Sequence, residues 1–339
     1  MKVSLVDYFE KNGNNDLLDY ENYDINAVNI SKKNALLYVL NYNKDNNLNL
    51  TDKQKKYLLE NSDLYHQDVN GSDALIDLIK NNVKQNINLT QSQKDFVLKN
   101  SNLKNQIKIQ KNALMFFSYN NESQGILFDE LQTKYFIEHS NLLLQSHVKD
   151  NCLAYLLKFK DYANIPLNDE HLKFLIKNTD LNQKIDGNKN VLMYIFSYNK
   201  KKKLNFSISA IEYLMTNTDL SHKDSADRIL LHYALHSNKR EDLGLTCQHF
   251  KPLVEAVDLK ENELLLEKAL EICKEDILLF PYLFNNFEDK DFLVNYIEKK
   301  DKFHVFMETS AFFSYKELSV LEKKINLSKV NKEVIVNKI

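Results

Sequence analysis

The chain has few of the residues that turns, strands and phosphate-binding loops require. Its 339 residues include five glycines, three prolines and no tryptophan. Strand-rich folds and glycine-rich nucleotide loops need many more glycines and prolines, so a long, mostly helical chain is what remains. Hydrophobic residues make up 43% of the sequence, which is enough for a packed core and excludes global disorder.

Cysteine and long apolar runs are also scarce. The three cysteines, Cys152, Cys247 and Cys273, are sparse and odd in number, which argues against a disulfide framework and fits a reducing compartment. The first apolar stretch is interrupted at Asp7, so we expect no cleavable signal peptide. No uncharged apolar run approaches the roughly 18 residues of a membrane span. We therefore expect no membrane insertion and a cytoplasmic protein.

Neither sign of charge is in excess, because the chain has 45 Lys and Arg residues and 47 Asp and Glu residues. Nothing draws the chain as a whole to nucleic acid. The basic run at 200–203 is interpreted as a solvated loop. No Gly-x-Ser-x-Gly or His-Glu-x-x-His sequence is present, so we expect no catalytic residue, cofactor or metal. The 43 asparagines, and lysine in place of arginine except at Arg228 and Arg240, are typical of an A/T-rich genome.

One pattern recurs along most of the chain with a constant step of 39 residues. It consists of a capping residue, a small or apolar residue and then a leucine. Seven leucines occupy the same repeat position: Leu36, Leu75, Leu114, Leu153, Leu192, Leu231 and Leu270. Regular spacing of this kind is the signature of a repeat architecture.

Each repeat contains signals for two helix starts. Good N-cap residues precede the first helix at Asn34, Asp73, Asn112, Asn151 and Asn190. A second series precedes the second helix at Thr51, Thr90, Asp129, Asn168, Ser207, Thr246 and Asn285. Four of these carry Gln or Glu three residues later, at Gln54, Gln93, Gln132 and Glu288, which is the capping-box spacing. The sequence therefore predicts an all-α solenoid of antiparallel helix pairs.

The predicted organisation is three-part. Residues 1–33 form an N-terminal cap with helices near 4–11 and 16–23, residues 34–267 form six repeats, and residues 268–339 form a degenerate repeat and a C-terminal cap with a helix at 316–324. Leucines that follow the second helix, such as Leu64 and Leu103, are expected in the core.

The units resemble ankyrin repeats. The resemblance rests on 218–224 (Thr-Asp-Leu-Ser-His-Lys-Asp) followed by 230–234 (Leu-Leu-His-Tyr-Ala), on 68–75 (Asp-Val-Asn-Gly-Ser-Asp-Ala-Leu) and on 24–29, and it covers roughly residues 24–260. The chain departs from the family in its 39-residue unit, against about 33, and in the loss of the glycine after the second helix. A HEAT-like solenoid is the alternative.

The resemblance implies a protein-binding module. Proteins similar to this chain, with degenerate repeats and a Lys and Asn bias, occur in intracellular bacteria, which implies an effector that is delivered into a host cell and acts on host proteins. We expect a monomer that binds a partner protein on its concave face and finger tips. The alternatives are an enzyme with an active site in 270–339, around Tyr282, Tyr296 and His304, or an architectural spacer.

Two sets of residues are candidates for partner binding. The first is an aromatic stripe two positions after the repeat leucine, where Asp77 takes one place: Tyr38, Phe116, Tyr155, Tyr194 and Tyr233. These rings either line the concave groove, as the resemblance implies, or pack between neighbouring helices. The second set lies in the variable connections between repeats: His66, His147, Lys184 and His222. Their variation indicates either specificity or drift on a solvated edge.

One histidine and cysteine cluster has residues that zinc favours. His232 and His236 share a helix face, and Cys247 and His249 begin the next helix. Paired Cys-x-x-Cys spacings are absent, so structural roles are favoured. The resemblance implies that His232 bonds to the backbone.

Overall fold

The computed structural model describes residues 2–15, 17–163, 165–202, 204–238, 240–257 and 266. In these residues the protein is all-α, as predicted, apart from two short strands that pair in parallel. Leu270, Cys273, Asn285, Glu288, the predicted helix at 316–324 and the alternative active site in 270–339 lie outside the described residues.

The chain divides into two compact units, residues 1–185 with 202–204 and residues 186–201 with 205–339. The first unit begins with β1 (Val3–Ser4), α1 (Leu5–Asn12), the 3-10 turn η1 (Tyr20–Asn22) and β2 (Tyr23–Asp24). It continues with the helices α2 (Ala35–Tyr42), α3 (Asp52–Asn61), α4 (Ala74–Asn81), α5 (Gln91–Lys99), α6 (Ala113–Asn120), α7 (Glu130–His139), α8 (Cys152–Ala163) and α9 (Asp169–Asn178). The described part of the second unit contains α10 (Val191–Tyr198), α11 (Ile208–Asn217), α12 (Leu230–Ser237) and α13 (Cys247–Glu255).

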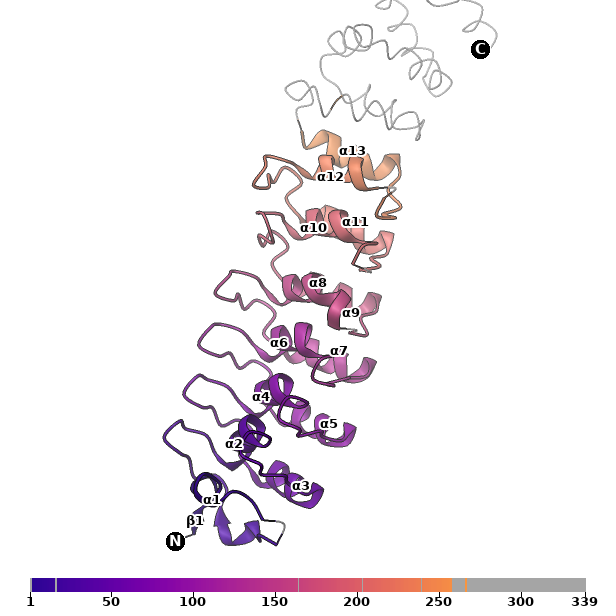
Figure 1. Cartoon of the computed structure of the whole chain (residues 1–339). Coiled ribbons are helices and arrows are strands. Elements are labelled where there is room, and N and C mark those ends of the chain that lie inside the picture. Colours follow the sequence, from indigo (N-terminus) through magenta and orange to yellow (C-terminus); the bar gives the residue numbers. More distant parts are fainter. Residues whose placement is uncertain are drawn as a thin grey trace, which may run out of the picture. The chain divides into compact units, whose positions relative to one another are not determined.

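The helices follow the predicted 39-residue step without exception. The A helices, α2, α4, α6, α8, α10 and α12, begin at residues 35, 74, 113, 152, 191 and 230. The B helices, α3, α5, α7, α9, α11 and α13, begin at residues 52, 91, 130, 169, 208 and 247. In the first unit each A helix contacts the next A helix, and each B helix contacts the next B helix. Figure 1 shows these pairs following one another within the unit.

The N-cap residues explain why the helices begin where they do. In the B helices α3, α5 and α7 the three predicted capping boxes form. The cap asparagines of the A helices have a second role, because their side-chain nitrogen donates to a carbonyl 29 residues later. Asn112 Nδ2 donates to Asn141 O at 2.9 Å while Asn112 Oδ1 accepts from Met115 N at 3.0 Å. One side chain therefore starts the A helix and fixes the connection that follows the B helix.

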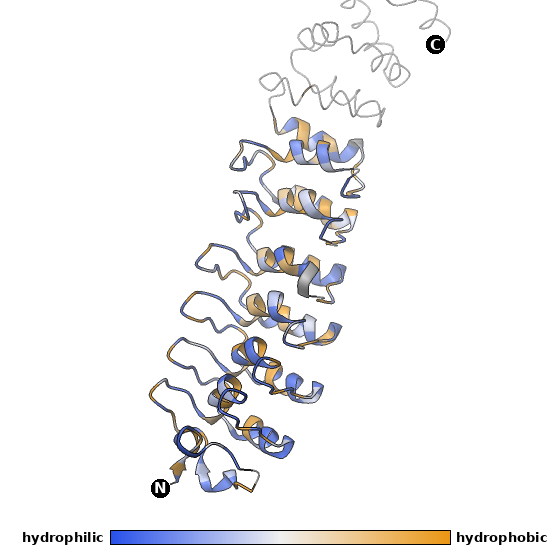
Figure 2. Ribbon diagram, viewed as in Figure 1, coloured by the Kyte–Doolittle hydropathy of each residue, from blue (hydrophilic) through white to orange (hydrophobic). Residues whose placement is uncertain are grey.

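Apolar residues concentrate on the A helices, as Figure 2 shows by colour. Six of the seven repeat leucines are described, and all are 3% exposed or less. The leucines after the B helices are also buried, at Leu64, Leu103, Leu142 and Leu181, whereas Leu220 is only half-buried. The A helices are therefore enclosed on most sides, and the B helices bury one side only.

The connections from each B helix to the next A helix are here called fingers. Each finger has a residue in the left-handed region at the same repeat position, namely Lys32, Gly71, Gln110, Lys149, Asn188 and Asp227, and Gly187 is a second such residue in its finger. Neighbouring fingers also share backbone hydrogen bonds, such as Lys108 N to Asn70 O at 2.9 Å. The fingers contain only short turns, as the low glycine and proline content predicts.

Asparagine supplies most of the other left-handed residues. All five glycines have positive φ, and so do Asn47, Asn49, Asn86, Asn88 and Asn205 in the connections from A to B helices. Asparagine tolerates this conformation better than other non-glycine residues. The asparagine bias that suggests an A/T-rich genome thus also has a conformational use in a glycine-poor chain.

The predicted second helix of the N-terminal cap, at 16–23, is wrong. The segment forms the 3-10 turn η1 and the strand β2, which pairs with β1 through Val3 with Tyr23 and Ser4 with Asp24. Asp19 accepts from Glu21 N at 3.2 Å, and this short-range bond favours a tight turn over a longer helix. The first predicted helix is confirmed as α1, with Ser4 as its N-cap.

Candidate functional site

The aromatic stripe is buried, which contradicts the expectation that its rings line an open groove. Exposure of its side chains runs from 2% at Tyr194 to 8% at Tyr233, with Tyr38, Phe116 and Tyr155 between them. Large rings remove much apolar area from water when helices stack, which favours packing over display. The alternative interpretation, that these rings pack within the structure, is therefore correct.

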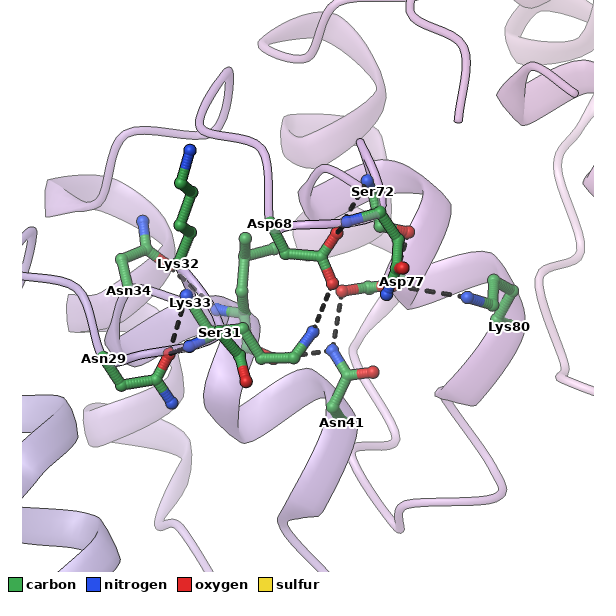
Figure 3. A network of polar contacts seen from close by, with 12 residues as sticks. Asn29, Ser31, Lys32, Lys33, Asn34, Asn41, Asp68, Ser72, Asp77 and Lys80 are labelled. Carbon is green, nitrogen blue, oxygen red and sulfur yellow. Dashed lines mark hydrogen bonds and ion pairs between the residues drawn. The ribbon is translucent and has the colours of Figure 1, made fainter. Parts of the chain in front are cut away.

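Asp77 occupies the stripe position in the second repeat and is also completely buried. Figure 3 shows how its carboxylate is satisfied. Ser72 Oγ donates to one oxygen at 2.8 Å, and Asn41 Nδ2 donates to the other at 2.6 Å. Burial raises the pKa of Asp77, while Lys80, 3.7 Å away, opposes that rise. The aspartate is thus a structural group rather than an exposed contact.

A buried ion pair lies in the same network (Figure 3). Lys33 Nζ lies 2.6 Å from Asp68 Oδ2, and both side chains are buried. Burial alone would raise the pKa of Asp68, but hydrogen bonds from Lys33, Ser72 and Asn70 lower it below its usual value. The finger turn is therefore closed by a carboxylate that stays ionised.

The four finger candidates divide into two kinds. His66 and His222 are half-buried, and each ring bonds to a carbonyl of the preceding finger: His66 Nε2 to Lys32 O at 2.7 Å and His222 Nε2 to Asn188 O at 2.6 Å. Asn105 and Gln183, at the equivalent repeat position, bond in the same way to Gly71 O and Lys149 O. These side chains hold neighbouring fingers together.

His147 and Lys184 are exposed, and their side chains form no such link between fingers. They remain candidates for contact with a partner, as the sequence analysis proposes. In the sequence all finger positions vary alike. In the structure, some finger side chains bond to the preceding finger and others are exposed to solvent.

The A helices carry a second, partly exposed row that the sequence analysis does not identify. Its members lie three residues after the stripe: Asn41, Lys80, Tyr119, Lys158, Ser197 and His236. All six are half-buried or exposed. In the first unit Tyr119 lies beside Phe159, with ring centroids 5.5 Å apart, and Lys111 Nζ is 5.2 Å from the Tyr119 ring centroid. This row could have been found from the 39-residue register, had each A helix been followed one turn further.

The second unit contains a basic pocket of about 380 Å³ beside α10 and α12. It is lined by Lys189, Ser197, Tyr198, Arg228, His232, Tyr233, His236, Ser237 and Arg240. Both arginines of the chain are in this set. None of these lining residues is an aspartate or a glutamate.

Each arginine is held by a neighbouring acid outside the pocket lining. Arg228 Nε and its NH2 group lie 2.9 and 2.8 Å from Asp224 Oδ2, which also accepts from the Tyr233 hydroxyl. These bonds lower the pKa of Asp224 although its burial opposes them. Arg240 Nε lies 3.1 Å from Glu241 Oε1, and its NH2 group donates to Ser237 Oγ at 2.9 Å.

The histidines of the candidate zinc cluster have structural partners. His232 Nδ1 accepts from Ile229 N at 3.3 Å, and His249 Nδ1 accepts from Thr246 N at 2.9 Å. His249 Nε2 also lies 3.1 Å from Glu212 Oε1. His232 and His249 each complete the start of their helix in the way that glutamine does in α3 and α5. No group of three or more potential metal ligands is found within the described part of the chain.

Among the described residues, none of the helices combines the length and the apolar character that crossing a bilayer would require. Comparison of the sequence with known protein families finds no match, and comparison with characterised proteins finds none either. Any argument about function therefore depends on the residues and contacts of this chain.

Proposed function

We propose that this chain is a non-enzymatic protein-binding module of the ankyrin-like type, which contacts its partner through the A-helix row and the open finger residues. The observation that carries the proposal is a partly exposed row whose residue type changes from repeat to repeat beside an invariant buried leucine. The A-helix row contains five different residue types in six repeats, while the buried leucine five residues earlier never varies among the described repeats. A constant scaffold with variable surface positions is how repeat proteins achieve specificity.

The rigidity of the fingers supports the same proposal. Backbone bonds between neighbouring fingers, and side chains such as Asn105 that bond to the preceding finger, restrict the positions of the exposed tips. A surface that is ordered before binding loses less conformational entropy when a partner binds. This preorganisation favours binding and is not needed by a spacer.

Tyr119 and Phe159 are the strongest anchor candidates in the first unit. Both rings are half-buried, and they lie 5.5 Å apart beside Lys111. Tyrosine is enriched at interface centres, because a rigid ring buries a large area with little loss of side-chain freedom. They take the anchor role that the sequence analysis assigned to the buried stripe.

The test is affinity capture with matched variants. Full-length protein that carries Tyr119→Ser and Phe159→Ser should lose at least one protein that the wild type retains from a lysate of infected host cells. A control with Lys56→Gln and Lys134→Gln, both exposed on B helices, should retain it. Equal capture by wild type and both variants would favour the spacer alternative. Circular dichroism must show the same helix content for all three proteins.

A further inference from the structure

The basic pocket of the second unit combines cationic groups that are rare or scattered elsewhere. Arg228 precedes α12 and Arg240 follows it, so the eight-residue helix brings both guanidinium groups to one cavity. Lys189 lines the same cavity. The whole chain has a net charge of −2, so this concentration of positive charge is local and does not reflect a general basic excess.

Both guanidinium groups are held in place and still offer donors. The Arg228 side chain is 49% exposed and stacks 5.3 Å from the Tyr233 ring centroid, while Asp224 binds two of its nitrogens. The Arg240 side chain is 63% exposed. An arginine has five N–H donors in a fixed plane, so each group keeps donors that face away from its intrachain acid.

The residue type itself indicates a planar acceptor. Lysine provides positive charge everywhere else in this chain, yet arginine stands at two positions of this one pocket. Guanidinium differs from ammonium in its paired, coplanar donors, which match the two oxygens of a carboxylate.

We infer that this pocket binds an acidic segment of the partner protein, with side-chain carboxylates on Arg228 and Arg240. The inference rests on the proposed protein-binding function and gives that function a partner chemistry. Arg228, Arg240 and Lys189 bring three positive charges, of which Asp224 and Glu241 offset two.

The pocket's other walls fit a peptide. The half-buried Tyr198 supplies ring surface, and the half-buried Ser197 supplies a hydroxyl oxygen that can still accept a hydrogen bond. A cavity of about 380 Å³ holds a few side chains rather than a folded domain. Carboxylates from an extended or loop segment would enter it beside Ser197 and His236, the members of the A-helix row that line this pocket.

The binding test uses a fluorescein-labelled hexaglutamate peptide and the full-length protein in low-salt buffer, read by fluorescence anisotropy. We expect saturable binding that weakens as salt rises, and no binding of a hexaglutamine peptide. Arg240→Gln should weaken hexaglutamate binding about tenfold or more, because a charge-assisted hydrogen bond is lost. Lys223→Gln removes an exposed charge of the same unit outside the pocket and should leave affinity unchanged.

Arg240 is the primary test site because its side chain is largely exposed. It also pairs with the buried Glu241, so helix content is checked by circular dichroism. Arg228→Gln should show the same weakening, with helix content checked by circular dichroism, since it also supports the buried Asp224. The two arginines provide a second readout. Two Nε–H correlations are expected in a nitrogen-15 spectrum of the whole chain, and both should shift on adding hexaglutamate.

Three outcomes would overturn the inference: equal binding of hexaglutamine, hexaglutamate binding unaffected by Arg240→Gln, or binding of inorganic phosphate at the arginines without binding of hexaglutamate. The result also separates this inference from the proposed function. Partner capture that depends on Tyr119 and Phe159 but not on the arginines would support the proposed binding function and contradict the inference of an acidic segment. Hexaglutamate binding that requires both arginines, without any captured partner, would support the carboxylate site and contradict the proposed binding function.

Discussion

Asp73 accepts a hydrogen bond from Asn105 Nδ2 at 2.7 Å, at a position where four other repeats have a cap asparagine. Burial raises the pKa of Asp73 to about 6. Between about pH 4 and pH 6, Asp73 therefore keeps its proton in the folded state, whereas in the unfolded chain, with a pKa near 3.8, it has lost that proton. As a result, the free energy of unfolding should fall as pH rises from about 4 to about 6, and it should stay lower above that window.

Asp73→Asn should therefore stabilise the protein at pH 7, by up to about 3 kcal/mol for a shift of roughly two pKa units. The asparagine oxygen can still cap α4 at Ile76 N, and Asn105 keeps its bond to Gly71 O. Urea unfolding at several pH values measures the effect, which should shrink towards pH 4. Asp52→Asn, at an exposed carboxylate, is the control and should change little. A destabilised Asp73→Asn protein at pH 7 would show that the charged form is favoured.

Substitution of lysine by glycine should have opposite effects on stability at a left-handed finger position and in the middle of a helix. Lys149 has φ of 63°, and Gly71 occupies the same position in another repeat. Lys149→Gly should stabilise the protein by about 1 kcal/mol, because a side chain is strained in this conformation. Lys173→Gly, in the middle of α9, should destabilise it by about 1 kcal/mol. Thermal unfolding of both variants checks the pair, and a loss of stability at Lys149 would contradict the argument from strain.

Asn82 links its repeat to the next through its side-chain nitrogen and holds the A-to-B connection of its own repeat through its side-chain oxygen. Its Nδ2 donates to Gln124 O at 2.9 Å, and its Oδ1 accepts from Leu89 N at 3.1 Å. Asn82→Ala should cost about 2–3 kcal/mol, since buried backbone groups lose their partners. Asn61→Ala removes an exposed amide that donates to Tyr57 O within α3 and should cost much less. Denaturant midpoints of the two variants decide whether the link contributes to stability.

Leu153 tests the register of the repeat. It is completely buried in α8, so Leu153→Ala should lower stability by about 2–5 kcal/mol. Leu131→Ala, at a leucine 78% exposed in α7, should stay within about 0.5 kcal/mol of the wild type. Similar melting temperatures for the two variants would mean that the assigned burial is wrong.

The sequence alone determined where the helices begin and how often the pattern returns. Both depend on local chemistry. A capping side chain such as Thr51 or Asn112 satisfies a backbone N–H a few residues away, and the leucine step records which face must be buried. The repeat length, the A and B helix starts and the buried leucines were therefore predictable without knowing which elements lie side by side.

Which face of an apolar helix meets another helix was decided only by the tertiary structure. Tyr155 occupies the stripe position of its A helix, and Tyr119 lies three residues after the stripe position in the preceding A helix. Tyr155 is buried, whereas Tyr119 is half-buried. Composition cannot distinguish them, because either ring suits a core or an interface. The same holds for Arg228 and Arg240, which are 12 positions apart in sequence and meet only because α12 and its flanking turns bring their side chains to one cavity. Packing between elements is a long-range property, and no local pattern in the sequence encodes it.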